Sequence, residues 1–349
     1  MAVAGFDPLV LTAEASLNQV IIGGLGCEEV AGIRAGQACS QAAMLTLATE
    51  CGLTGLQPHK LADGIAAAAA ASTRGRRAAS AALMAYGRRL GALIATLRDP
   101  GTPGQQARTP ARHACLSCWL TVDSIWLGGG LLAGGCGPVI LAGVQAAAAA
   151  AVRPCRVALT PYPAIAPLLG AALHMPTTNV GEVAAVADLG HTSIKTAVAQ
   201  RRATALTRLS LLGSCPAPSG QSADEVEDAV TWALARAVKH AAAHPRGSRV
   251  LVIASVASYV SAGAPADDGR GIYGCLANRV TSLRNRLSDI TGAQVTLQFV
   301  HDGTAAAATA GLVNSATITA GTWLGSGFRP AEAPPPLDLT PDLALTGSP

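Results

Sequence analysis

Residues 181–200 have the sequence GEVAAVADLGHTSIKTAVAQ, and this stretch decides the fold class. Two apolar runs, residues 183–187 and 194–199, flank a short polar segment that contains glycine, a pattern that predicts a β-hairpin. An aspartate, Asp188, stands where the first strand ends and the turn begins. The hairpin therefore brings a carboxylate to one end of a predicted sheet.

The segments that follow the hairpin alternate between helix and strand patterns. Ser222-Ala-Asp-Glu225 forms a capping box, and apolar residues at helical spacing follow it, which predicts an amphipathic helix. A buried strand over 249–255, a polar loop over 261–272, a helix over 274–290 and a strand over 294–300 come next. This order is typical of an α/β protein.

A second α/β unit is predicted upstream of the hairpin. It begins with a long helix over 74–98, and a short strand over 124–127 runs into Gly128-Gly129-Gly130. A helix over 137–151, a strand over 156–160 and a helix ending near Leu173 complete this unit.

The composition limits the classes of function. At roughly 100–200 residues per domain, a chain of 349 residues is expected to form two lobes. No run of about 18 apolar residues is free of interruptions, so a membrane partner is not expected. The first residues, MAVAGFDPLVL, lack a signal-peptide pattern. Nine scattered cysteines, an odd number, are typical of buried thiols in a reducing compartment. We expect a cytoplasmic protein.

Two further classes of site have little support. The 25 basic residues form no block, so nucleic acid is not an expected partner. Cys115 and Cys118 form a CxxC without a second CxxC or a nearby pair of histidines, and structural thiols are favoured over a metal or redox site.

Four short motifs have the residue types that phosphoryl transfer requires. The first is Asp188-Leu-Gly-His-Thr-Ser-Ile-Lys195, in which a glycine turn exposes backbone N–H groups to an anion and the carboxylate can hold hydrated Mg²⁺. The second is the turn Gly321–Gly327, with Thr322 and Ser326, which also suits phosphate. Either motif alone is more typical of an ordinary turn.

The third motif is His301-Asp302-Gly303 at the end of a predicted strand and the start of a small-residue helix. Asp302 can accept a proton from a hydroxyl that attacks a phosphoryl group, or it can simply cap the helix. Its position shortly before the second phosphate turn favours the catalytic interpretation. The fourth motif, Gly128–Gly130, is bare enough for a flat ring to lie against the backbone, as an adenosine pocket needs.

These four motifs resemble those of the repressor/ORF/kinase (ROK) family of sugar kinases in the hexokinase–actin superfamily. Residues 188–195 and 321–327 are similar to the two phosphate motifs of the family, 301–307 to its catalytic motif and 125–130 to its adenosine motif. The resemblance extends over most of residues 20–330. It implies an α/β fold of two lobes, that of the actin-like ATPases (ribonuclease H-like), with ATP and Mg²⁺ as cofactors.

The resemblance also implies a role for each matching residue. Asp302 is then the catalytic base, and Asp188 holds Mg²⁺ through water. The residues that bind the nucleotide are Gly190, His191, Thr192 and Lys195 in the first phosphate motif, Gly321, Thr322, Gly325 and Ser326 in the second, and Gly128, Gly129 and Gly130 on the adenosine side. A homodimer is a further implication.

The order of the motifs differs from that of the family, because the GGG motif comes first, so the chain looks circularly permuted. Residues 1–174 then resemble the C-terminal part of the family, the larger lobe with the adenosine side, and 175–182 form a linker. Residues 183–305 resemble the N-terminal lobe with the first phosphate motif and the catalytic Asp. Residues 306–349 carry the second phosphate motif back to the larger lobe and end in a Pro-rich extended arm. Permutation is tolerated where the old termini lie close together.

Departures from the family pattern concern zinc and the substrate. Residues 20–27 correspond to the family's CxCGxxGC, of which only Cys27 remains, so no structural zinc is expected. The sugar-binding GE-x-GH motif has no clear counterpart, although Asp7 falls near the position of its Glu. His301 replaces Asn and either binds substrate or packs, and Ser258 and Tyr259 occupy the place of the substrate loop.

The sequence therefore predicts a kinase that transfers the γ-phosphate of ATP to a hydroxyl of a sugar or sugar-like polyol. Loss of the residues that read a hexose ring favours a cyclitol or a modified sugar as the acceptor. The alternative is a non-catalytic sensor or scaffold of the same fold that binds sugar or nucleotide. It is favoured by His191 and Trp323, which replace glycines of the two phosphate motifs.

Overall fold

The structure is a computed structural model that describes residues 11–177, 183–218, 222–244, 249–266, 271–310, 312–329 and 337–347. The candidate substrate residue Asp7 lies outside this set. The contacts divide the chain into two compact units. Unit 1 is built on Glu14–Ala164 and Ala310–Pro330, and unit 2 on Ile165–Thr309 and Ala331–Pro349. Both units are therefore assembled from separate stretches of the chain.

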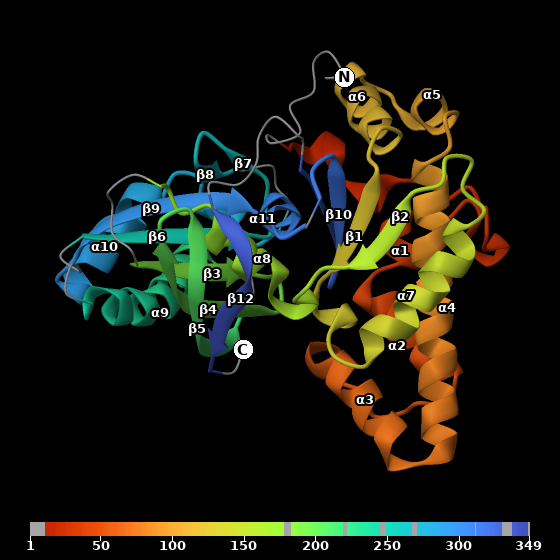
Figure 1. The fold of residues 1–349 in the computed structure, drawn as a ribbon, viewed down its shortest axis with the longest axis horizontal. Helices are drawn as coiled ribbons and strands as arrows, with labels where there is room; N and C mark the ends of the chain where they lie inside the picture. Colours follow the sequence, from red (N-terminus) through yellow and green to blue (C-terminus); the bar gives the residue numbers. More distant parts are fainter. Residues whose placement is uncertain are drawn as a thin grey trace. The chain divides into compact units, whose positions relative to one another are not determined.

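Unit 1 contains a four-stranded sheet of order β11-β10-β1-β2 (Figure 1). Strands β10, β1 and β2 are parallel, and β11 returns antiparallel to β10. The strands are β1 (Ser124–Gly128), β2 (Arg156–Leu159), β10 (Ser315–Ala320) and β11 (Leu324–Arg329). The predicted strands over 124–127 and 156–160 are confirmed.

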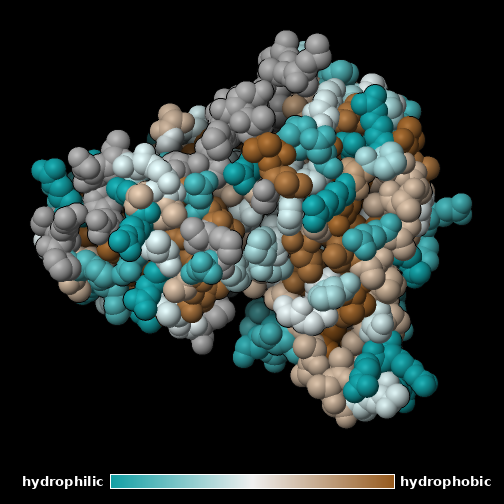
Figure 2. All heavy atoms as spheres, in the orientation of Figure 1, coloured by the Kyte–Doolittle hydropathy of each residue, from teal (hydrophilic) through white to brown (hydrophobic). Residues whose placement is uncertain are grey.

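Seven α-helices of the described chain belong to unit 1. They are α1 (Ala35–Ala38), α2 (Gln41–Glu50), α3 (Leu61–Ala71), α4 (Thr73–Leu97), α5 (Thr102–Gln106), α6 (Pro110–Trp119) and α7 (Cys136–Ala148). The predicted helices over 74–98 and 137–151 are confirmed as α4 and α7, which pack against each other. The free end of the α3–α4 pair is tan and teal in Figure 2, because exposed alanines of α3 and arginines of α4 meet there.

Unit 2 contains a six-stranded sheet of order β12-β5-β4-β3-β6-β9. Strands β3, β4 and β5 form an antiparallel meander, and β6 and β9 continue the sheet parallel to β3. The strands are β3 (Val183–Leu189), β4 (Ser193–Arg202), β5 (Ala205–Pro216), β6 (Arg249–Val256), β9 (Gln294–His301) and β12 (Asp338–Thr346). The predicted hairpin is thus confirmed as β3 and β4, with Asp188 inside β3 rather than in the turn.

Helices cover both faces of this sheet. Alternate residues of β3, including Ala185 and Leu189, share a core with α9 (Ala223–Ala242) and α10 (Val280–Thr291). The other residues of β3 face the opposite side. There α8 (Ala166–Leu173) packs on the sheet and on α11 (Asp302–Ala308). The capping box of Ser222 and Glu225 at the start of α9 is formed as predicted.

Several segments add to or differ from what the sequence suggested; the helix predicted over 274–290, for example, begins only at Val280 as α10. Helix α8 was expected within the first segment, 1–174, but the contacts group it with unit 2 because it packs on that sheet. The described part of the expected arm is strand β12, which pairs with β5 and covers that part of the sheet edge. The loop 261–272 includes a small hairpin of β7 (Val260–Ser261) and β8 (Ala264–Pro265). No helix in the described residues is both long enough and apolar enough to span a membrane.

Helices α9 and α10 are joined by a buried carboxylate, Glu227. Its side chain is 4% exposed and contacts Arg279 at 3.0 Å, Ser282 at 2.6 Å and Arg286 at 3.4 Å. Burial opposes the charge, but the hydrogen bonds from Ser282, Arg279 and Arg286 outweigh it and leave the pKa of Glu227 below its ordinary value. The contact therefore stabilises the folded chain at neutral pH.

We expect Glu227→Gln to lower the free energy of unfolding by about 1–3 kcal/mol at pH 7, because buried partners lose a charged acceptor. Since the pKa of Glu227 is lowered by folding, this difference should shrink as the pH falls through 4.5 and below. Urea unfolding at pH 7 and at pH 4 measures both values. The control is Glu50→Gln on the exposed end of α2; an equal loss in both variants would contradict the assignment.

Candidate functional site

The site in unit 2 lies where parallel strands β3, β6 and β9 end, because the carboxyl ends of parallel strands share one edge of a sheet. Asp188, near the end of β3, is 4% exposed. Its Oδ2 lies 3.0 Å from Lys195 Nζ on β4, and its Oδ1 accepts a hydrogen bond of 2.9 Å from Ser255 Oγ on β6. Strand register explains both contacts, since Asp188 is paired with Lys195 and with Ser255.

The turn between β3 and β4 is short and held from two sides. Gly190 N donates to Ser193 O at 3.1 Å, and the buried Tyr273 donates its hydroxyl to Gly190 O at 2.9 Å. Thr192 is exposed at the turn. Burial lowers the pKa of His191 against the opposing charge of Asp302, so its imidazole is neutral at pH 7. The turn is thus held by hydrogen bonds on both sides of Gly190, and His191 lies close enough to Asp302 to sense its charge.

Asp302 is the first residue of α11, directly after β9. Its Oδ1 accepts a hydrogen bond of 2.7 Å from Gly303 N, and 22% of its side chain is exposed. Burial and, second, the charge of Asp188 raise the pKa of Asp302 from 3.8 to about 6, while His191 and Gly303 N–H act in the opposite direction. The charges of Asp188 and His191 thus both act on the carboxyl group of Asp302, in opposite directions.

His301 caps α11 next to this carboxylate. Its Nδ1 accepts a hydrogen bond of 3.3 Å from Thr304 N, and burial lowers its pKa to about 4, so the ring is neutral. The ring proton is then on Nε2, which lies 3.2 Å from Asp302 Oδ1. The ring of Tyr259 stacks on His301 with 5.2 Å between centroids. Both ring nitrogens of His301 thus have neighbours within the protein.

Ser258, the substrate candidate next to Tyr259 in the loop after β6, does not contact His301 in the way that Tyr259 does. Ser258 is 8% exposed, and its hydroxyl donates to Ala266 O at 3.4 Å. The same residue, Ala266, donates its N–H to Tyr259 O at 2.7 Å. The loop is therefore closed on itself at Ser258, and Tyr259 is the residue of the pair that contacts the site.

In unit 1 the end of β1 lies beside the end of β10. Gly128 is paired with Thr319, and the next residue, Gly129, has a φ of +103°. A Cβ on Gly129 would lie 2.2 Å from Ala320 O, so no larger residue fits. A Cβ on Gly130 would meet no atom within 4 Å. The structure thus brings the GGG motif and the approach to the second phosphate turn side by side.

The second phosphate turn is shorter than the sequence suggested. Strands β10 and β11 pair up to Ala320 and Leu324, which leaves Gly321, Thr322 and Trp323 for the turn. Gly325 and Ser326, expected in the turn, lie in β11, and Ser326 is 5% exposed. The exact point where a hairpin closes depends on strand register, which the glycines alone did not reveal.

Three residues that support these motifs were not identified from the sequence. Ser255 and Tyr273 hold Asp188 and Gly190, and Asn18 binds both backbone groups of Leu324 next to the second turn, at 2.9 and 3.0 Å. Ser255 stands at the end of a predicted strand, a position that could have drawn attention to it. Asn18 gave no such signal, because it lies 306 residues from its partner.

The carboxylates suit a hydrated magnesium ion better than a bare one. In the described residues, no group of three or more His, Cys, Asp or Glu side chains is close enough to enclose a metal. Mg²⁺ usually keeps several waters and takes one or two carboxylates together with phosphate oxygens. Asp188 and Asp302 meet that requirement, although Lys195 and Ser255 already contact the oxygens of Asp188. Their donor set is compatible with Mg²⁺ brought by a phosphate ligand.

Because folding raises the pKa of Asp302, the ionised carboxylate lowers the free energy of unfolding of the protein. The cost is absent below the ordinary pKa of 3.8 and fully present above about pH 6, because folding then opposes ionisation. We expect Asp302→Asn to raise the free energy of unfolding by about 1–3 kcal/mol at pH 7.5, and the gain to disappear near pH 4. Thermal unfolding at the two pH values measures this; a variant less stable than the wild type at pH 7.5 would contradict it.

Comparison with known proteins gives one partial likeness. No family model matches the chain, and no curated protein does. Among solved structures, a ROK hexokinase from Thermus thermophilus is similar, with 23% sequence identity and a TM-score of 0.25. The match covers 43% of this chain and 48% of the hexokinase, so the chain spans about half of that protein.

Proposed function

We propose that this protein is an ATP-dependent kinase that transfers the γ-phosphoryl group to a hydroxyl of a sugar or sugar-like polyol. The observation that carries the proposal is the pair of carboxylates, Asp188 and Asp302, at the strand ends of unit 2. One of them is held by a lysine and a serine, and the other has a pKa of about 6. Two carboxylates in such different surroundings can take separate roles. Asp302, whose pKa is raised, suits a base, and Asp188, which contacts Lys195 and Ser255, suits a metal ligand.

Asp302 is the base in this proposal. Ionised at neutral pH, it accepts the proton of the acceptor hydroxyl as that oxygen attacks the γ-phosphorus and the bond to the bridging oxygen of ADP breaks. Gly303 N–H binds Oδ1, so we assign the proton to Oδ2. A base with a pKa of about 6 is ionised at pH 7 and still basic enough to assist.

Asp188 would hold Mg²⁺ through water, and the ion would neutralise charge that develops on the phosphate oxygens. Lys195 is positioned by Asp188 and can bind a phosphate oxygen once nucleotide competes for its ammonium group. Gly190, His191 and Thr192 would bind phosphate through the turn that Tyr273 supports. In unit 1 we assign phosphate to Gly321 and Thr322 and adenosine to Gly128–Gly130. Gly325 and Ser326, which lie in β11 directly after this turn, stay assigned to the same phosphate site.

The sheet of unit 2 supports the actin-like ATPase interpretation. A ribonuclease H-like lobe has a three-stranded antiparallel meander continued by parallel strands, and β5-β4-β3-β6-β9 has this order. Circular permutation remains part of the proposal, since the motif order along the chain supports it.

A non-catalytic sensor is the second candidate. It is favoured by Lys195, whose contact with Asp188 leaves that carboxylate less available to a metal, and by His191 and Trp323 at glycine positions of the motif. A thermal shift with ATP or ADP and Mg²⁺ tests nucleotide binding, which both candidates allow. Absence of any shift would contradict the kinase proposal.

ATP consumption by the purified protein, measured against a panel of hexoses, amino sugars and cyclitols, tests catalysis. We expect acceptor-dependent formation of ADP and a phosphorylated product for one class of polyol. Nucleotide binding without phosphorylation of any member of the panel would favour the sensor.

A further inference from the structure

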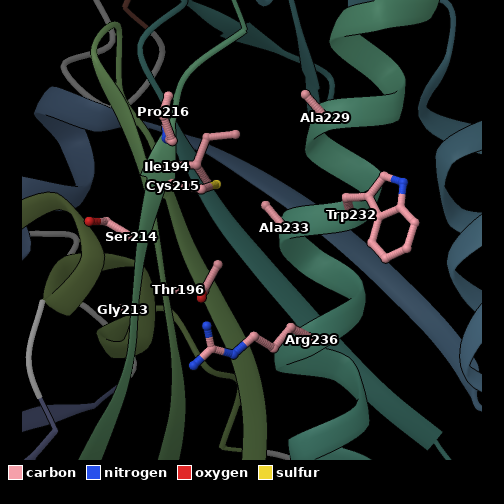
Figure 3. Close-up of a pocket in the computed structure, with 10 residues that line it drawn as sticks. All are labelled: Ile194, Thr196, Gly213, Ser214, Cys215, Pro216, Ala229, Trp232, Ala233 and Arg236. Carbon is pink, nitrogen blue, oxygen red and sulfur yellow. The ribbon is translucent and has the colours of Figure 1, made fainter.

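The outer side of α9 has a feature that the proposed kinase reaction does not use. Trp232 lies in the middle of this helix and is 79% exposed. Next to it, a groove of about 320 Å³ lies between α9 and strands β4 and β5 (Figure 3). A large exposed aromatic side chain beside an open groove is typical of a surface that binds a partner.

The groove has the size and chemistry to receive an aromatic ring. Figure 3 shows Ala229 and Ala233 pointing from α9 toward the strands, where Ile194 and Cys215 also line the groove. Arg236 reaches from the same helix toward β5 beside Gly213. Small apolar side chains leave room for a flat ring, and a guanidinium group at its face adds a cation–π contact. Trp232 itself projects from the rim of the groove, away from the strands.

The exposed side chains of α9 that share a side with Trp232 are acidic before this residue and basic after it. Asp228 lies four residues before it and Arg236 four residues after it; Glu225 lies seven before and Lys239 seven after. All of these side chains are exposed, and spacings of four and seven place them on one side of a helix. A gradient from acidic to basic complements the helix dipole, but the dipole does not account for an exposed tryptophan at its centre.

We propose that α9 pairs with α9 of a second copy of this chain in antiparallel orientation, with Trp232 of each copy in the groove of the other. A two-fold axis at Trp232 makes the surface self-complementary, because each copy presents both a tryptophan at the rim of its groove and a groove for the tryptophan of the other copy. Asp228 then meets Arg236 of the second copy, and Glu225 meets its Lys239. A parallel arrangement would instead place acid against acid and base against base.

The ion pairs within the chain are compatible with this arrangement. Asp228 already accepts from Arg286 at 2.5 Å, yet 57% of its side chain is exposed and can accept from a second donor. Glu225 caps α9 through Ser222 and is also exposed. The pairing does not depend on the proposed kinase activity, because no residue of the Asp188–Asp302 site takes part.

Sedimentation velocity over a concentration series tests the proposal, first with the wild type and three variants. We expect the wild type to dimerise and Trp232→Ala to weaken dimerisation on the order of 100-fold or more, since each dimer loses two buried indoles. Asp228→Arg and Arg236→Asp should each weaken it at least about tenfold, because each creates two contacts between like charges. Arg202→Asp, on an exposed end of β4, is the matched control and should dimerise normally.

The decisive measurement is a mixture of Asp228→Arg with Arg236→Asp. In an antiparallel pair both contacts regain opposite charges, so the two monomeric variants should form a 1:1 heterodimer. If Asp228→Arg does not fold, Ala229→Gln fills the groove without changing a charge and should give a monomer. The proposal is overturned by a monomeric wild type, by a dimer that Trp232→Ala leaves intact, or by two folded charge variants that do not associate when mixed.

Discussion

Asp302→Asn is expected to reduce acceptor-dependent ADP formation by about 10²–10⁴-fold, the range that a general base contributes. The amide cannot accept the proton of the acceptor hydroxyl, although it has nearly the same shape and can still accept from Gly303 N–H. Nucleotide binding, measured by thermal shift with ATP and Mg²⁺, should remain largely intact. Turnover in the wild type should also rise with pH, reach half of its maximum near pH 6 and level off above about pH 7, because the base must be ionised.

The control for this substitution is Asp289→Asn, which removes an exposed carboxylate of α10. It should keep full turnover. Undiminished phosphorylation by Asp302→Asn would remove Asp302 from the role of base. Loss of both turnover and nucleotide binding would show that the carboxylate serves the fold of the site instead of the chemistry.

Gly170→Ala is expected to lower the free energy of unfolding by about 3–5 kcal/mol, among the largest effects of a single methyl group. Gly170 lies in α8, where a Cβ would stand 1.7 Å from Ala305 O of α11. Backbone atoms cannot give way as a flexible side chain can, so the two helices must separate. Because α11 begins with Asp302, we also expect turnover to fall in whatever fraction remains folded.

Gly104→Ala is the matched control for that experiment. Gly104 lies inside helix α5, and a Cβ there would meet no atom within 4 Å. Alanine favours helix relative to glycine, so this variant should be unchanged or slightly more stable. Urea unfolding of both variants distinguishes a steric clash from a general effect of replacing glycine. Equal stability of the two variants would show that α8 and α11 approach less closely.

Local sequence patterns predicted most elements of the fold. The apolar runs over 183–187 and 194–199 predicted β3 and β4, and the capping box at Ser222 predicted α9, because these signals depend on neighbours within a few residues. Strand β12 was missed, since a Pro-rich segment carries little strand signal and its partner β5 lies more than a hundred residues earlier. The membership of α8 in unit 2 likewise depends on a distant contact, that of Gly170 with Ala305.

The sequence predicted the two carboxylates of the candidate site but not the residues that contact them. Asp188 and Asp302 could be chosen because each lies at the end of a predicted apolar strand with a glycine close behind it. The electrostatic interaction between the two carboxylates could not be predicted, because it requires that β6 lie between β3 and β9 in the sheet. The same holds for Ser255, whose role depends on its exact register with Asp188. Ser326 was expected in the turn because the glycines around it are typical of turns, but it lies in strand β11.

Because each unit is built from separate stretches, the order in which the ribosome releases the chain matters. Strand β1 emerges early, but one of its edges stays unpaired until β10 follows, nearly two hundred residues later. One edge of β5 likewise stays unpaired until β12 has been synthesised. During synthesis the nascent chain therefore presents open strand edges, which are sites for mispairing with other chains. Newly made protein should depend on chaperones that cover such edges until residue 346 has been added.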